Sequence, residues 1–457
     1  MLIIVTLFTI LSIVLYIEGY KVIAITWFVY LYSNCFYMVS PISIKYTDLA
    51  LLLLISLLLV EGSNFTIKNE VIKWMTIFVA FCITLLMISC FLYDESLASS
   101  FRAGRNYLAI IGILLFYNLK RSEINNVIFY ISILTIFADI IYILQTVLEQ
   151  SLLYNSMDEI GTGYAGKLRF YNLPSMTSLV FYTLLFNKKL FPNKIRFISI
   201  VITGFAILLT QHRSALIGNI IVIVSVFLLY GTSVQKRFIK IILCISVISL
   251  IAINFFTGDF SKVIISDINN IVQGNYNNYT LSGANPETLS YRIALLSERL
   301  HYIFVDAPFY KILIGLGFIP ELSYTMFHNY NFKIGIYDSS GLNANMLFGP
   351  DIAWANLFCQ IGLLGIILYL LLLISLLKKY WNYRIITDED SFKITFCIFL
   401  EIFITSFTSA SFSNAFSIVS IIAFSKFFQV EKEYNKKYIL KQIIKVKSRN
   451  HEVISKN

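Results

Sequence analysis

Long apolar segments make up most of the chain, and its polar positions gather in short stretches between them. Many of the apolar runs approach or exceed the ~20 residues that a helix needs to cross a hydrocarbon core of about 30 Å. A β-barrel would need short segments of alternating hydrophobicity instead. The pattern predicts an all-α polytopic membrane protein with about 12 to 14 transmembrane helices. The candidate spans are residues 2–17, 22–39, 46–61, 71–92, 105–118, 124–148, 173–187, 195–211, 214–230, 238–256, 352–377, 392–409 and 412–428.

One long polar stretch, Thr257–Pro350, interrupts this alternation. A membrane protein with a single large aqueous loop usually places its chemistry or its recognition there. We therefore expect four regions: an N-terminal transmembrane bundle at 1–256, a large extracytoplasmic loop at 257–350, C-terminal transmembrane helices at 351–428, and a basic cytoplasmic tail at 429–457.

The loop contains one clear helical pattern, within Thr288–Val305. Its apolar residues recur in steps of three and four, as on one face of a helix. We expect an amphipathic helix at the membrane surface with this stripe buried and its two arginines, Arg292 and Arg299, at headgroup depth. The residues of the stripe are Leu289, Ile293, Leu296, Leu300 and Ile303.

Composition and charge agree with a membrane location. The chain is 58% hydrophobic and 14% charged, against about 25% charged in soluble domains, and its mean hydropathy is +0.75. The net charge of +10 lies largely in short loops and in the tail, which is the positive-inside signal rather than a sign of nucleic-acid binding. These loops share one side of the predicted spans, so the C-terminus is expected in the cytoplasm and the large loop outside.

Three arginines, Arg169, Arg213 and Arg292, are predicted on the outer face, where the positive-inside rule disfavours them. A guanidinium fork binds phosphate oxygens in pairs. Pairing with a neighbouring carboxylate or snorkelling is the structural alternative for each. Arg213 is the strongest of the three for phosphate, because it stands in a very short turn between two spans.

Two residues compete as the general base. His328 lies in the polar loop, and histidine titrates near neutral pH. Asp351 lies at the mouth of the following span, where it equally suits a helix N-terminus. Within apolar runs, Asp139 and Glu401 are intramembrane carboxyls, which keep a proton-coupled transporter open as an alternative.

Several chemistries lack their motifs. The sequence has no phosphate-binding glycine loop, no HExxH zinc pair and no nucleophile elbow. The six cysteines lie singly in apolar segments, with neither metal-ligand nor disulfide spacing. We therefore expect no cofactor and no metal. Among the outer aromatics, Tyr291 and Trp354 are candidates for stacking on sugar rings, although aromatic belts at membrane interfaces explain such residues as well.

The order of these features resembles the superfamily of O-antigen polymerases (Wzy) and O-antigen ligases (WaaL). Many spans, a hairpin turn with a basic residue, a large outer loop and a few final spans follow one another in the same way. The local segments that carry the resemblance are Arg169-Phe-Tyr-Asn-Leu-Pro174, Thr210-Gln-His-Arg213-Ser-Ala215, Ser290-Tyr-Arg292 with Gly315-Leu-Gly317, and the loop exit from Asn356 to Gly365.

The resemblance implies transfer of a growing glycan from undecaprenyl pyrophosphate to the next lipid-linked repeat unit, at the outer face of a bacterial inner membrane. It implies pyrophosphate binding by Arg213 and Arg292, with Arg169 and Arg299 secondary. His328 or Asp351 would deprotonate the acceptor hydroxyl. Weaker glycan contacts are expected from Trp354, Asn356 and Tyr291.

The resemblance also leaves alternatives. Ligases of the superfamily usually carry a histidine before the asparagine of the loop exit, whereas Asp351 and Trp354 precede Asn356 here. This difference favours a polymerase. A ligase, a flippase for the same lipid-linked unit and a non-catalytic scaffold remain as rivals. The implied partners are the lipid-linked oligosaccharide, membrane lipid, a chain-length regulator and a flippase, with no nucleic acid.

Overall fold

The computed structural model describes residues 2–33, 46–62, 70–150, 152–153, 160–162, 168–170, 173–210, 213–230, 289–319, 332, 352–383, 389–407 and 412. Outside these residues lie the expected span at 238–256, the expected span at 412–428 except for Phe412, and the tail at 429–457. The same holds for most of the large loop, including His328 and Asp351.

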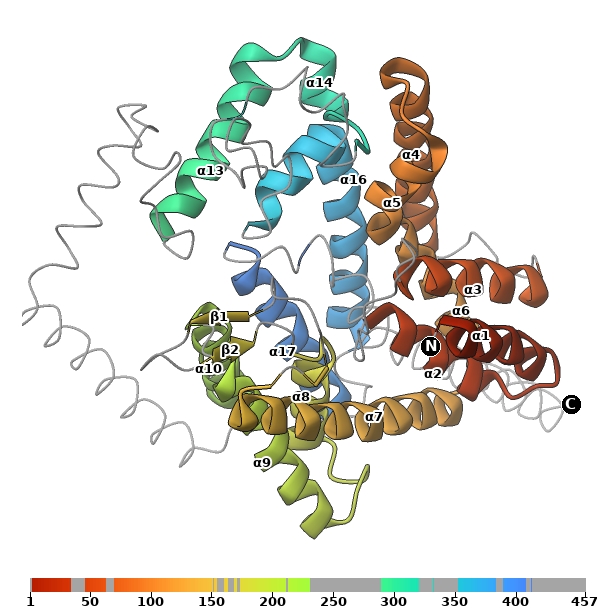
Figure 1. Cartoon of the computed structure of the whole chain (residues 1–457), viewed down its shortest axis with the longest axis vertical. Coiled ribbons are helices and arrows are strands. Elements are labelled where there is room, and N and C mark those ends of the chain that lie inside the picture. Colours follow the sequence, from red (N-terminus) through yellow and green to blue (C-terminus); the bar gives the residue numbers. More distant parts are fainter. Residues whose placement is uncertain are drawn as a thin grey trace, which may run out of the picture.

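The described chain is mainly helical, as the apolar runs predict, and Figure 1 shows the arrangement of its helices. The elements are α1 (Leu2–Ile17), α2 (Lys21–Ser33), α3 (Tyr46–Glu61), α4 (Glu70–Tyr93), α5 (Leu97–Leu108), η1 (Ala109–Gly112), α6 (Ile113–Asn118), α7 (Arg121–Leu148), β1 (Ile160–Thr162), β2 (Leu168–Phe170), α8 (Thr177–Phe186), α9 (Asn193–Leu209), α10 (Arg213–Tyr230), α13 (Leu289–His301), η5 (Tyr302–Asp306), α14 (Phe309–Ile314), α16 (Ala353–Tyr383) and α17 (Glu389–Thr405).

Among the described residues, three helical stretches are long and apolar enough to cross a membrane: Glu70–Tyr93, Arg121–Leu148 and Ala353–Lys378. Shorter apolar helices accompany them, and large apolar side chains face outward from the bundle. Phe91 is 81% exposed and Leu59 is 77% exposed. Such exposure is unfavourable in water and suits a lipid environment. The helical class is therefore confirmed, and the apolar helices agree with a membrane association.

Two expected spans take a different form. Residues 105–118 were expected to form one span, but the chain there is divided among α5, the 3₁₀-helix η1 and α6. The Ser96 side chain caps α5 by accepting a hydrogen bond from the Ser99 N–H at 3.2 Å. The segment 173–187 forms only the ten-residue α8, which spans about 15 Å. Hydropathy alone did not separate these short helices from full spans.

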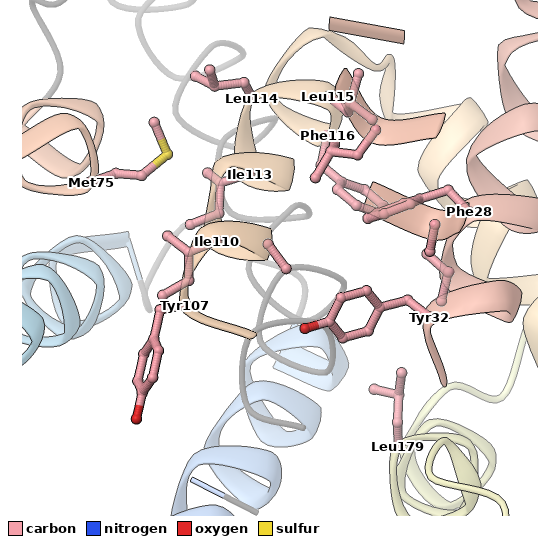
Figure 2. Packing of buried hydrophobic residues seen from close by; sticks show 14 of the residues in the cluster. Phe28, Tyr32, Met75, Tyr107, Ile110, Ile113, Leu114, Leu115, Phe116 and Leu179 are labelled. Carbon is pink, nitrogen blue, oxygen red and sulfur yellow. The ribbon is translucent and has the colours of Figure 1, made fainter. Parts of the chain in front are cut away.

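The main apolar core joins the first half of the chain to its last helices. Figure 2 shows part of it, with residues from α2, α4, α5, η1, α6 and α8 packed together. Phe28, Phe116 and Leu115 are almost fully buried there. This core fixes α8 against the N-terminal helices, and α8 in turn contacts α7, α9 and α17.

The helix α16 is broken at Gly362. This residue has φ +60° and ψ −172°, so the helix consists of two parts, residues 353–361 and 363–383. The expected span at 352–377 therefore forms as a long apolar stretch, but with a break that the hydropathy pattern does not show. The break has a steric cause, because the loop backbone passes directly beside it. A Cβ on Gly362 would lie 2.2 Å from the Gly315 nitrogen, and the Leu316 N–H donates to the Cys359 carbonyl at 2.6 Å.

The Gly-Leu-Gly segment of the loop therefore docks inside the helix bundle. Gly315 and Gly317 have φ of +75° and +83°, values that glycine adopts easily. The Phe318 N–H donates to the Ser89 Oγ at 2.8 Å. The Phe318 ring stacks on Tyr107, with centroids 5.7 Å apart, and fills the space above Gly104. The loop is thus anchored in the helix bundle through these contacts.

The loop helix α13 forms where the periodicity predicts it, and its buried face includes part of the predicted stripe. Ile303, just after the helix, is fully buried, and Leu296 packs on Ala294 and Leu295, whereas Ile293 is 37% exposed. Arg299, which was expected at headgroup depth, is buried as well. Because α16 supplies a packing surface for α13, the buried face extends beyond the stripe to Ala294 and Leu295.

Candidate functional site

The strand that carries Arg169 lies beside the end of α9. In the β1–β2 hairpin, Arg169 is paired with Gly161. The next residue, Phe170, is held by α7, because the Tyr142 hydroxyl donates to the Phe170 carbonyl at 2.8 Å. Phe170 also belongs to an apolar cluster that includes Leu209 at the end of α9. The Arg169 backbone is thereby brought close to the end of α9.

The helix that begins at Arg213 packs against the end of α17. Gly218 provides a close approach, since a Cβ at this position would lie 3.5 Å from the Thr405 Cγ2. Asn219 follows it and donates to the Glu401 carboxyl at 3.3 Å. The start of α10 and the end of α17 therefore lie at the same end of the bundle.

The end of α17 also holds the start of α16. The Ala353 N–H donates to the Ser406 carbonyl at 3.1 Å, and the Trp354 indole N–H donates to the Ser406 Oγ at 3.1 Å. The Trp354 ring stacks on Phe412, with centroids 5.5 Å apart. Trp354 is thus partly buried in the contact between these helices, with its N–H engaged within the protein.

The arginine-bearing loop helix completes this end of the bundle. Ala294 and Leu295 of α13 pack on Ile352 and Ala355 at the start of α16, and Figure 1 shows α13 beside the first part of α16. Arg292 lies on the first turns of α13 and is partly buried. Tyr291 precedes Arg292 on α13, and the structure describes only its backbone, which is helical.

Asn356 is a buried polar residue at this junction whose side-chain oxygen can accept a further hydrogen bond. It is only 4% exposed, and its side-chain oxygen has no hydrogen-bond partner among the described residues. A buried amide oxygen without a partner costs about 1–3 kcal/mol. A hydroxyl donor reaching this oxygen would recover that cost. Asn356 therefore fits the predicted contact with a polyhydroxylated ligand better than the engaged Trp354 does.

Arg299 has a structural environment. It is fully buried, its Nη1 lies 2.5 Å from the Glu298 carboxylate, and its guanidinium carbon lies 3.9 Å from the centroid of the Phe332 ring. These contacts account for its charge inside the loop, away from the surface position expected for it. Pyrophosphate binding by Arg299 remains a prediction.

Two titratable groups that follow Arg299 in the loop are shifted by burial. Burial raises the pKa of the Tyr302 phenol to about 12, with a smaller contribution from Tyr93. Burial also lowers the pKa of Lys311. Tyr302 is therefore a neutral hydroxyl at physiological pH, unsuited to act as a base. The candidates for that role, His328 and Asp351, lie outside the described residues.

A polar network runs through the helices below this end. On α8, Thr177 donates to Asp139 at 2.6 Å and Ser178 donates to Glu401 at 2.7 Å. Asn219 links Glu401 to α8 again, because it accepts a hydrogen bond from Tyr182 at 2.7 Å. The sequence pointed to the two carboxyls alone. Their partners were missed because hydroxyl and amide residues are ordinary in apolar helices.

The residues selected from the sequence lie on elements that follow one another in a series of contacts. β2 contacts the end of α9, α9 contacts α10, and α10 packs on α17, whose end holds the start of α16, on which α13 packs. Arg169, Arg213, Asn356 and Arg292 lie on β2, α10, α16 and α13 of this series. Among the described residues, no group of three or more His, Cys, Asp or Glu side chains is placed to hold a metal ion.

Comparison with known proteins adds no relative: no protein-family model matches the sequence, and no curated protein matches it either. The resemblance to the O-antigen polymerase and ligase superfamily therefore rests on the order of the elements and on the short segments given above.

Proposed function

We propose that this chain is a polysaccharide polymerase of the bacterial cytoplasmic membrane. It transfers a growing glycan from a polyprenyl pyrophosphate to the next lipid-linked repeat unit, on the outer face of that membrane. The observation that supports this proposal is the series of contacts that links the elements of the candidate site residues at one end of the helix bundle. Arg213 begins a helix there, the Arg292 helix packs on α16 there, and Asn356 offers a buried acceptor.

The chemistry requires charge stabilisation more than activation. The pyrophosphate donor is already activated, so the reaction needs no nucleotide. As the glycosidic bond to the carrier breaks, negative charge grows on the leaving pyrophosphate. Positioned guanidinium groups stabilise such charge without a metal. Arg213 and Arg292 take this role in our proposal, Arg169 and Arg299 assist, and His328 or Asp351 accepts the proton of the attacking hydroxyl.

The proposed membrane arrangement follows the basic loops. We place about 12 to 14 helices in the membrane, with the site end of the bundle outside and the C-terminus in the cytoplasm. Asn356, Trp354 and Tyr291 face the glycan side of the site in this scheme. A flippase would supply the lipid-linked unit, and a chain-length regulator would act on the product.

Substitution of the two principal arginines tests the proposal. Arg213→Ala and Arg292→Ala are expected to accumulate in the membrane but to lower polymerisation by about 10²-fold or more, as for loss of a transition-state donor. Surface glycan would then stop at one repeat unit on its anchor. Arg102→Ala, an exposed arginine on α5, is the matched control and should give normal long chains.

Other results of these experiments would contradict the arginine roles or change the proposed class of protein. Normal chain-length ladders in both arginine variants would show that the pyrophosphate roles are wrong. Deletion of the gene separates the enzyme classes: loss of chain elongation alone supports a polymerase, while loss of even the single-unit product indicates a ligase or a flippase.

One observation favours a transporter as the second candidate. Asp139 is fully buried in α7, and one of its carboxyl oxygens has no hydrogen-bond partner among the described residues. Buried carboxyls of this kind occur in proton-coupled transporters. Asp139→Asn separates the two functions, because a proton-coupled flippase would lose transport of the lipid-linked unit, whereas a polymerase would still elongate its glycan.

A further inference from the structure

The Glu401 carboxyl lies where three helices meet. On its own helix, α17, it is partly buried. Its Oε1 accepts a hydrogen bond from the Ser178 hydroxyl of α8 at 2.7 Å and another from the Asn219 side-chain amide of α10 at 3.3 Å. Asn219 is itself held by the Tyr182 hydroxyl of α8. One carboxyl oxygen thus joins α8, α10 and α17.

Each of these helices leads directly to a candidate site residue. Asn219 lies within two turns of Arg213 at the start of α10. Ser406 follows Glu401 within about two turns and holds the start of α16 through Ala353 and Trp354. The segment before α8 leads back to β2 and Arg169. The junction at Glu401 therefore sets the relative positions of elements that are far apart in the sequence.

An apolar packing contact would not fix these elements as tightly. Helices that contact through side chains of similar size can slide or rotate, whereas a hydrogen-bonded carboxyl requires one geometry. Catalysis depends on such precision, since a displacement of about 1 Å at a reacting group can lower the rate by about 10²-fold.

We propose that Glu401 is a positioning residue of the polymerase: its carboxyl holds α10 and α17 in the register that directs Arg213 and the start of α16 toward one substrate. The proposal rests on the function proposed above. It assigns Glu401 the role of a hydrogen-bond acceptor, and not that of a proton carrier on a transport path.

A matched pair of substitutions separates these roles. Glu401→Gln keeps a side-chain oxygen that accepts from Ser178 and Asn219, but it removes the charge and the titration. Glu401→Leu keeps the approximate volume and removes the acceptor. Glu18→Leu, at an exposed glutamate after α1, controls for the general effect of replacing a carboxyl.

The first measurement reports geometry without using activity. Gly218→Cys and Thr405→Cys are introduced together in full-length protein whose six native cysteines are replaced by alanine. Disulfide formation in membranes is then followed by loss of maleimide labelling. We expect Glu401→Leu to slow the cross-link at least about fivefold, while Glu401→Gln and Glu18→Leu stay within about twofold.

The second measurement is polymerisation by purified protein with a lipid-linked repeat unit, with kcat expressed per folded molecule. We expect kcat to fall about 10²-fold in Glu401→Leu with a much smaller change in KM, and Glu401→Gln to restore it. A purely structural role would reduce the amount of folded protein but leave kcat per folded molecule unchanged. If the leucine variant fails to accumulate, Asn219→Ala takes its place, because it removes the contact from α10 to Glu401 together with the hydrogen bond from Tyr182.

The two proposals fail in different ways. An unchanged cross-linking rate in Glu401→Leu, or an equal loss in Glu401→Gln, overturns the positioning role. If cross-linking responds as expected but the wild-type protein elongates no glycan, the polymerase function is wrong while the helix junction stands. Equal loss of elongation in the glutamine and leucine variants, with cross-linking intact, indicates that the reaction needs the titrating carboxyl itself, and it also overturns the positioning role.

Discussion

Arg299 carries a positive charge into the packed interior of the loop. Its partners are a neighbouring carboxylate, Glu298, and the face of the Phe332 ring. An ion pair at such a position adds little net stability relative to apolar residues, but removal of one partner leaves the other charge buried and uncompensated. At the scale of single residues, the buried contacts of Arg299 therefore give it a structural role in the loop.

This environment predicts that loss of the Arg299 side chain lowers stability. Arg299→Ala is expected to destabilise the protein by about 3–5 kcal/mol, the usual cost of breaking a buried ion pair. Thermal unfolding of the detergent-solubilised protein measures the effect. Exposed Arg102→Ala should stay within about 0.5 kcal/mol of wild type. An Arg299→Ala protein with normal stability and no polymerisation would instead support the predicted contact with pyrophosphate.

At the scale of elements, the contact between α16 and the Gly-Leu-Gly segment fastens the loop to the helix bundle. The sequence showed both Gly315 and Gly362, and it placed them in separate features, a helix-breaking turn and a span. Their contact could not be predicted, because it depends on two backbones approaching each other across a large separation in sequence. Periodicity reports which residues share a face of a helix, but it carries no information about which backbone lies against that face.

The glycine at the break is expected to be indispensable. In Gly362→Ala the new Cβ would lie 2.2 Å from the Gly315 nitrogen, and alanine would also have to adopt φ +60°. We expect a loss of more than about 2 kcal/mol, since strain and overpacking add. Thermal unfolding and increased protease cleavage of the loop are the measurements. Gly218→Ala is the control, because its Cβ meets only ordinary contacts, the nearest at 3.5 Å.

At the scale of the whole molecule, apolar runs and short turns predicted most of the described helices. Helices α3, α4, α7, α9 and α10 begin and end within a few residues of the expected spans. The residues of the candidate site were selected from the sequence, and their common role stays a prediction. The links through Glu401 and Ser406 could not be predicted, because side-chain hydrogen bonds between helices leave no periodic trace in the sequence.

The orientation of the bundle provides the last prediction. Helix α9 begins beside the basic segment that contains Lys189 and ends beside the start of α10. The basic segment and the candidate site therefore lie at opposite ends of α9, which spans about 26 Å. By the positive-inside rule, Lys189 faces the cytoplasm and the loop residue Asp306 faces outside. Both side chains are exposed.

Single cysteines at these two positions test this orientation. A membrane-impermeant maleimide should label Asp306→Cys in intact cells or spheroplasts, and should label Lys189→Cys only after the membrane is permeabilised. The unsubstituted protein is the control for native cysteines. Labelling of Lys189→Cys in intact cells, with protection of Asp306→Cys, would place the candidate site in the cytoplasm. A site there could not act on lipid-linked units at the outer face, so this result would refute the polymerase together with its orientation.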